Sequence, residues 1–106
     1  MICSVASLWE EYGHALDKFA KGRGLTLTYS AEGHGWSDPH IQLSWVNPQE
    51  HLCDMYLGHV RDEVFHVRVI CWGPLNEIGR HDWDLDLQKD RLTVVLLEAK
   101  HWGDRL

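Results

Sequence analysis

Long apolar runs are absent from this chain of 106 residues. A membrane-spanning helix needs about 20 consecutive apolar residues, and no stretch here approaches that length. The start of the chain also lacks the basic region and the apolar core of a secretory signal, because Glu10 and Glu11 follow too closely. We therefore expect a cytoplasmic protein that does not enter membranes.

Cysteine is scarce, with three residues, and ten Lys and Arg are outnumbered by sixteen Asp and Glu. A small, odd number of cysteines predicts reduced thiols instead of a disulfide framework. The formal charge of −6 repels the phosphate backbone, so we expect no direct binding of duplex DNA. A protein partner with a basic surface is favoured instead.

Motifs with a known catalytic mechanism are missing as well. The chain has no phosphate-binding loop, no dinucleotide fingerprint and no glycine-flanked serine elbow. The paired Cys-x-x-Cys and His-x-x-x-His spacings that are typical of small zinc sites do not occur either. These absences predict a protein that is not an enzyme and that needs no metal and no cofactor.

An apolar content of 44% is present, and it suffices for one core in a single domain over residues 1–106. The clearest pattern lies at residues 63–72, where Phe65, Val67 and Val69 alternate with other side chains. A period of two residues indicates a strand with one buried side. We predict that this is the central strand, with its valines facing an N-terminal helix.

Residues 4–21 carry apolar side chains at the three-and-four spacing of a helical face. Ser4 or Ser7 is suited to cap the start of such a helix, and Gly22 or Gly24 to end it. The segment therefore predicts an amphipathic helix that covers one face of a sheet.

Alternating apolar residues predict three further strands, at 25–29, 40–46 and 81–88. Residues 48–57 fit either a short helix or a strand. We slightly favour the strand, because residues 61–63 would then close a hairpin onto residues 63–72.

The last segment, residues 90–106, is compatible with a helix or a strand. Asp90 can cap a helix here and Gly103 can end it, whereas residues 92–97 also have strand propensity. The capping residues favour the helix. The predicted fold class is α+β: an antiparallel meander of four to six strands packed on the N-terminal helix, with a possible short C-terminal helix.

Asp82, Asp84 and Asp86 share one face of the predicted strand at 81–88. Their spacing resembles the opening of a calcium loop, but the glycine and glutamate that an EF-hand needs further on are absent. Carboxylates on one strand face repeat every ~6.6–6.8 Å, close to the ~7 Å between every second phosphate of a DNA strand. These residues are a solvated face in the simplest interpretation, and candidate binding residues in the alternative one.

A glycine-rich loop at residues 31–39 supplies two more candidate binding residues. His34 lies between two glycines, and Trp36 has no place in the core pattern. Loops often carry function, whereas tryptophan is mostly buried. Trp36 therefore either anchors a partner or folds back over the edge of the sheet.

Cys53 supports two alternative functions. With His51 or His66 as base and Asp54 to orient that base, Cys53 would be the nucleophile of a small hydrolase or thiol enzyme. With Cys71 and neighbouring histidines, it would belong to a metal-binding module.

The leading hypothesis is a non-enzymatic acidic interaction protein. Small size, negative charge and missing catalytic motifs all favour it. Such a protein would act as an inhibitor or immunity-type protein that masks a basic surface of a nucleic-acid-handling protein. A phage-encoded anti-defence protein, or the antitoxin partner of a nuclease, would fit this description.

Overall fold

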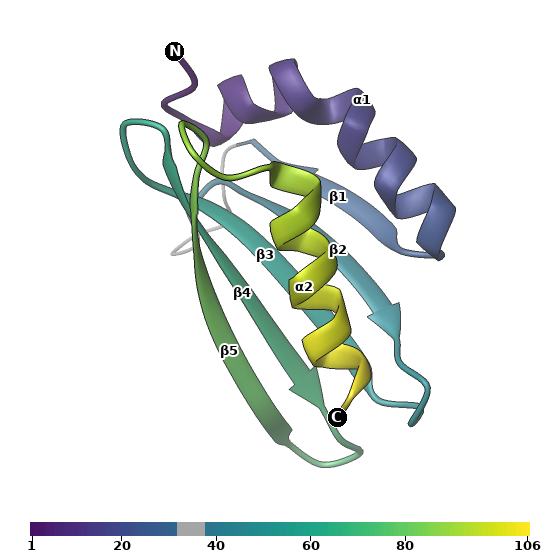
Figure 1. Ribbon diagram of the computed structural model, residues 1–106. Helices are drawn as coiled ribbons and strands as arrows, with labels where there is room; N and C mark the ends of the chain where they lie inside the picture. Colours follow the sequence, from purple (N-terminus) through teal and green to yellow (C-terminus); the bar gives the residue numbers. More distant parts are fainter. Residues whose placement is uncertain (32–37) are drawn as a thin grey trace.

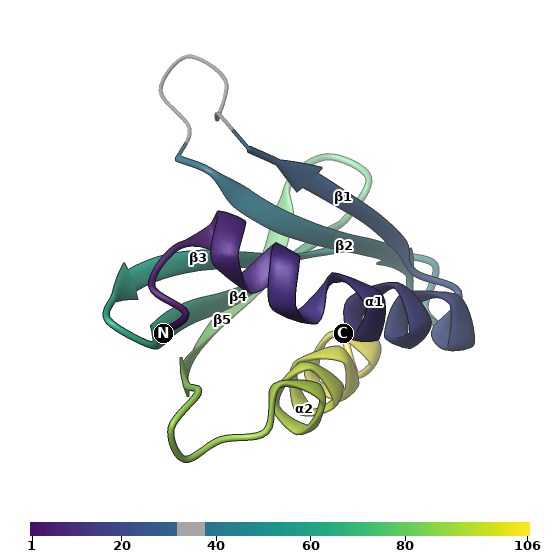
Figure 2. The same cartoon turned by 90° about the horizontal axis from the view of Figure 1, so that it is seen from above.

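The computed structural model describes residues 1–31 and 38–106. In these residues a five-stranded antiparallel sheet carries two helices on one face (Figures 1 and 2). The elements are α1 (Val5–Arg23), β1 (Thr26–Ser30), β2 (His40–Val46), β3 (Leu52–Arg61), β4 (Val64–Trp72), β5 (Glu77–Asp86) and α2 (Leu92–Asp104). The strands lie side by side in chain order, as a meander. The predicted α+β fold class is confirmed, including the C-terminal helix.

The first helix, α1, begins at a reciprocal serine cap. The hydroxyl of Ser4 accepts the backbone N–H of Ser7 at 3.0 Å, and the hydroxyl of Ser7 accepts the backbone N–H of Ser4 at 3.0 Å. Gly24 ends the helix with a φ of 69°, a left-handed conformation that glycine adopts without strain. The predicted helix is confirmed, and it extends to Arg23.

The core fills the space between the sheet and the helices. Alternate positions of the three middle strands point toward the helices and are fully buried, which is why their sequences show a period of two. These core residues are Ile41, Leu43, Cys53, Met55, Leu57, Phe65, Val67, Val69 and Cys71. Because each apolar side chain of this size contributes roughly 1.5–3 kcal/mol when buried, this layer is the main source of stability.

Two predictions about residues 63–72 are wrong. The middle strand of the sheet is β3, because β5 adds a further strand beyond β4. In addition, α1 packs on β1, β2 and β3, whereas β4 lies mainly beneath α2. Val67 and Val69 are fully buried, as predicted, but the C-terminal helix covers their strand. Alternation within one strand reports a buried side and carries no information about which helix buries it.

Residues 48–57, which fit two states in the sequence, form a turn followed by the start of β3. The side-chain carbonyl of Asn47 accepts the backbone N–H groups of Gln49 and His51, at 3.0 and 2.9 Å. Asparagine stabilises turns by this kind of local hydrogen bond. The favoured strand is confirmed, and the hairpin to β4 closes at residues 61–63 as predicted.

The predicted helix at the end of the chain is confirmed, but both of its predicted ends are wrong. Asp90 does not cap α2, because its carboxylate accepts the backbone N–H of Asp86 at 2.9 Å. Gly103 lies inside the helix. A Cβ atom at position 103 would lie 2.7 Å from Cζ2 of Trp45, so the glycine permits close contact between α2 and the sheet.

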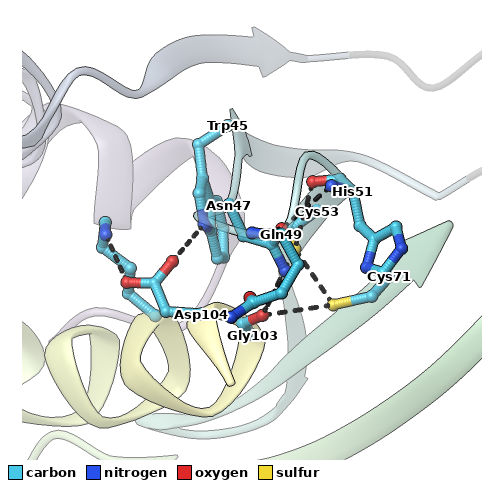
Figure 3. A network of polar contacts seen from close by, with 9 residues as sticks. Trp45, Asn47, Gln49, His51, Cys53, Cys71, Gly103 and Asp104 are labelled. Carbon is cyan, nitrogen blue, oxygen red and sulfur yellow. Dashed lines mark hydrogen bonds and ion pairs between the residues drawn. The ribbon is translucent and has the colours of Figure 1, made fainter. Parts of the chain in front are cut away.

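A polar network fixes the C-terminal end of α2 to β2 and the turn that follows it (Figure 3). The side-chain amide of Asn47 donates to the carbonyl of Gly103 at 2.8 Å. The indole N–H of Trp45 donates to the carboxylate of Asp104 at 2.8 Å, and Lys100 pairs with the same carboxylate at 2.6 Å. Among the described residues, no buried side-chain polar atom is left without a partner. These contacts position the helix.

Candidate interaction surface

The sheet face turned away from both helices, called the open face below, is not covered by another helix or strand of the described chain (Figure 2). Even-numbered positions of the middle strands project from it, since odd-numbered positions face the core. These positions are His40, Gln42, Ser44 and Val46 on β2, Leu52, Asp54 and Tyr56 on β3, and His66, Arg68, Ile70 and Trp72 on β4.

One end of the open face carries three exposed apolar side chains, called the apolar row. They are Val46, Leu52 and Trp72, which the strand register places next to one another. Their exposed fractions are 66%, 46% and 37%. Ile78 at the bulge of β5 and Leu75 in the preceding turn add apolar surface at this end. Contiguous exposed apolar side chains mark binding surfaces, and tryptophan often anchors partners.

Asp54 lies beside the apolar row and is only 8% exposed. Its Oδ1 atom accepts hydrogen bonds from Ser44 Oγ at 2.7 Å and from Gln42 Nε2 at 3.3 Å. Its Oδ2 atom accepts one from the indole N–H of Trp72 at 3.1 Å. All three donors are neutral. A buried carboxylate therefore stands on the open face with hydrogen bonds and without a cation among the described residues.

The two arginines on this face are paired with other carboxylates. Arg68 Nε lies 2.7 Å from Asp82 Oδ1, and this hydrogen bond lowers the pKa of Asp82 below its ordinary value. Arg80 donates two hydrogen bonds to Glu77, and they lower the pKa of the glutamate. Neither guanidinium group is bonded to Asp54.

The predicted acidic row lies on β5, where Asp82 and Asp84 pair in register with Arg68 and His66. Its members are not equivalent. Asp82 is bound by Arg68 and also lies 3.1 Å from His66 Nε2. Asp84 is exposed and takes part in no ion pair among the described residues. Between Asp82 and Asp84, the carboxylate of Asp84 is therefore the one more accessible to a partner.

The third member of the acidic row, Asp86, is half-buried at the end of β5. Its carboxylate accepts the backbone N–H of Gln88 at 3.0 Å, and its own N–H donates to Asp90. Asp86 therefore helps to form the turn that leads into α2, in addition to any role in binding.

His34 and Trp36, the two loop candidates, fall at residues 32–37 and lie outside the described residues. Sequence reasoning misses the apolar row itself, because exposure of Val46 and Leu52 depends on both helices choosing the other face. The one local signal was Trp72, which alternates in phase with His66 and Arg68.

The residues of the alternative thiol site are divided between the two faces of the sheet. Cys53 faces the helices and is fully buried, whereas Asp54 and His66 project from the open face. Burial and the adjacent Cys71 thiol raise the pKa of Cys53. An activated nucleophile needs the opposite shift. His51, the other candidate base, is adjacent to Cys53, but its Nδ1 atom lies 2.6 Å from the carbonyl oxygen of Leu106 and its ring forms no hydrogen bond with the Cys53 thiol among the described residues.

The metal alternative draws on Cys53 and Cys71, whose Sγ atoms lie 3.0 Å apart. Both thiols also lie near the carbonyl oxygen of Gly103, at 3.7 and 3.9 Å (Figure 3). Within residues 1–31 and 38–106, no three His, Cys, Asp or Glu side chains are placed so that they would hold a metal ion. The two cysteines pack as small apolar side chains with weak hydrogen bonds.

An open hollow of about 750 Å³ lies on the outer side of α2, away from the open face. It is lined by Val94, Leu97, Glu98, His101, Asp104 and Arg105. The carboxylate of Asp104 is already bound by Trp45 and Lys100. The hollow has no counterpart of the buried carboxylate of Asp54, which lies on the open face. We therefore take the open face as the candidate site.

Comparisons with known protein families, curated proteins and solved structures find no match to this chain. No helix in the described part of the chain is both long and apolar enough to cross a membrane.

Proposed function

We propose that this chain is a non-enzymatic interaction protein that binds a larger protein through its open face. The observation that carries the proposal is the apolar row, three large side chains exposed on a sheet face that no described helix covers. Exposure of contiguous apolar surface to water is unfavourable. A partner that covers Val46, Leu52 and Trp72 removes this cost.

The charges of the open face favour a basic partner. Asp54, Asp82 and Asp84 lie on it, and the two arginines are held in ion pairs with Asp82 and Glu77. The whole chain carries a formal charge of −6. Complementary potentials speed association and select among partners. The proposed partner therefore presents apolar side chains flanked by lysine and arginine.

The same charges argue against a second copy as the occupant. Two chains of charge −6 that met through their open faces would each bring Asp54, Asp82 and Asp84 into the shared interface. Like charges in an interface oppose association. A basic partner gains from the same carboxylates.

The partner class that fits best is a nucleic-acid-handling protein. Its nucleic-acid groove is basic, and an acidic chain that occupies the groove competes with phosphate groups. Asp84, exposed at the β5 edge, supplies one free carboxylate for this purpose. The chain would then act in the cytoplasm as an inhibitor or immunity-type protein, for example as a phage-encoded anti-defence protein.

The test compares the proteins that the purified chain and its variants capture from a native lysate. Leu52→Ser and Trp72→Ser each truncate the apolar row. Val94→Ser is the matched control, because Val94 is 58% exposed on α2, away from the open face. We expect one stoichiometric basic protein that binds the wild type and the control and is lost from both open-face variants.

Two further measurements complete the test. Far-UV circular dichroism must show that each variant is folded. The captured protein, once purified, must bind the wild-type chain directly. Capture that is equal for all variants would remove the open face from consideration, and a wild-type dimer that Leu52→Ser dissociates would identify a second copy as the occupant.

A further inference from the structure

Asp54 is the one charged side chain that is buried in the described part of the molecule. It projects from the open face, where carboxylates are normally solvated. Moving a carboxylate out of water is costly unless a cation or enough hydrogen bonds compensate it. Its three donors, Ser44, Gln42 and Trp72, are all neutral. Among the described residues, the carboxylate is therefore held by hydrogen bonds and has no cation bonded to it.

The hydrogen bonds from the described residues leave part of the carboxylate unused. An ionised carboxylate offers about four acceptor positions. Oδ1 of Asp54 accepts two hydrogen bonds, from Ser44 and Gln42, whereas Oδ2 accepts one, from Trp72. The remaining acceptor position lies on Oδ2, next to the indole ring.

Aromatic and aliphatic side chains border this carboxylate. Trp72 touches Asp54 through its indole N–H and is 37% exposed. Tyr56 follows Asp54 on the same face of β3, and burial together with the charge of Asp54 raises the pKa of its hydroxyl. Leu52 precedes it on the same face and is 46% exposed. A cation gains energy over an aromatic ring, and the alkyl part of its side chain gains from apolar neighbours.

The two arginines of the open face already form ion pairs with other carboxylates. Arg68 is bonded to Asp82 at 2.7 Å, and Arg80 to Glu77 through both Nε and a terminal nitrogen. Moving either guanidinium group to Asp54 would break the ion pair that it already forms. A cation from outside would complete the site without that loss.

We propose that Asp54 is the recognition site for one cationic side chain, arginine in preference to lysine, of the protein partner. This inference rests on the proposed function and names the partner group that the open face accepts. The guanidinium group lies over the indole of Trp72 and donates one N–H to Oδ2 of Asp54, while its alkyl stem lies along Leu52. Arginine is preferred because its planar, weakly hydrated head stacks on aromatic rings better than an ammonium group does.

The experiment follows the indole N–H signal of Trp72 by ¹H–¹⁵N NMR, assigned by its loss in Trp72→Phe. The probes are N-acetyl-arginine amide, N-acetyl-lysine amide and N-acetyl-citrulline amide, at millimolar concentrations. Citrulline has the shape of arginine without its charge. We expect the arginine probe to shift the signal most, the lysine probe less, and the citrulline probe little.

Two variants test whether the shift of the Trp72 signal arises from binding at Asp54. Asp54→Asn should abolish the shift, because it removes the charge and keeps the shape. Glu98→Gln is the control, because Glu98 is an exposed carboxylate on α2, away from the open face, and forms no ion pair among the described residues. The comparison of arginine with citrulline uses the unmodified chain, so the inference remains testable if Asp54→Asn does not fold.

The outcomes separate this inference from the proposed function. No shift with arginine, or equal shifts with arginine and citrulline, would overturn it. With the captured partner in hand, Asp54→Asn should weaken binding about tenfold or more, as expected at a central contact. A partner that is lost from Leu52→Ser but kept by Asp54→Asn would leave the proposed function standing and refute the role of Asp54.

Discussion

The indole of Trp45 donates a hydrogen bond to the carboxylate of Asp104 at 2.8 Å, although 59 residues separate the two in the chain. The same indole lies where a side chain at Gly103 would be, since a Cβ there would come within 2.7 Å of it. The packing of α2 on the sheet therefore depends on this hydrogen bond and on glycine at position 103, where a side chain would overlap the indole. A change at either position should disturb the helix that covers β4.

Gly103→Ala should lower the free energy of unfolding by about 1–3 kcal/mol, the usual range for an overpacked core. Alanine favours a helix, but here its methyl group would overlap the ring of Trp45. Gly22→Ala is the matched control, because Gly22 is also helical and an added Cβ meets nothing within 4 Å. The control should gain up to about 1 kcal/mol. Urea unfolding measures both, and a stabilised Gly103→Ala would refute the close contact.

Val67→Asp should unfold the chain, whereas Arg68→Ala should leave it folded. Val67 is fully buried. The free-energy cost of an unpaired charge at such a position exceeds the free energy of unfolding of a typical domain, ~5–15 kcal/mol. Arg68 pairs with Asp82 on the open face, where both side chains are over a third exposed, so its loss should cost at most ~1 kcal/mol. Denaturant unfolding of the two variants side by side decides the matter. A folded Val67→Asp beside a collapsed Arg68→Ala would invert the two faces of β4.

The stability of the chain should fall at alkaline pH because of its two buried thiols. Burial raises the pKa of Cys53 and of Cys71 in the folded chain. The contribution is fully present below the unfolded pKa of about 8.5 and is lost as the pH rises toward the folded values. The loss approaches about 1.4 kcal/mol per pH unit for each thiol. Unfolding measured at about pH 7, 9 and 10 should show a steeper loss of stability with pH than in the variant Cys53→Ala/Cys71→Ala. Parallel curves would contradict it.

At acidic pH, the ion pair of Asp82 should make the stability of the chain fall as the pH is lowered. The hydrogen bond from Arg68 is the main cause that lowers the pKa of Asp82. Its contribution is present above the unfolded pKa of about 3.9 and is lost as the pH falls through the lower folded value. Because the pair is well exposed, we expect Asp82→Asn to lose less than ~1 kcal/mol at neutral pH. The difference from wild type should vanish in strong acid, and a difference that persists there would exclude the ion pair as its cause.

Local patterns determined the elements of this protein and the faces of its strands. The alternation around Val67 and Val69 predicts a strand with one buried side, because the direction of successive side chains is a property of the extended backbone. The serines and glycines around residues 4–24 likewise predict a helix and its ends, because capping hydrogen bonds join close neighbours. Asp82, Asp84 and Asp86 share a face for the same local reason.

Tertiary structure alone decided which surface is left for a partner. The burial of Asp54, the exposure of Leu52 and the contact of Gly103 with Trp45 each depend on strand register and on both helices lying over one face. Strand register and helix placement join segments that are far apart in the chain. The spacing of neighbouring residues therefore does not encode them. The sequence by itself determined that each strand has a buried and a solvated side, and packing decided that the solvated sides form one face with an apolar end and a buried carboxylate.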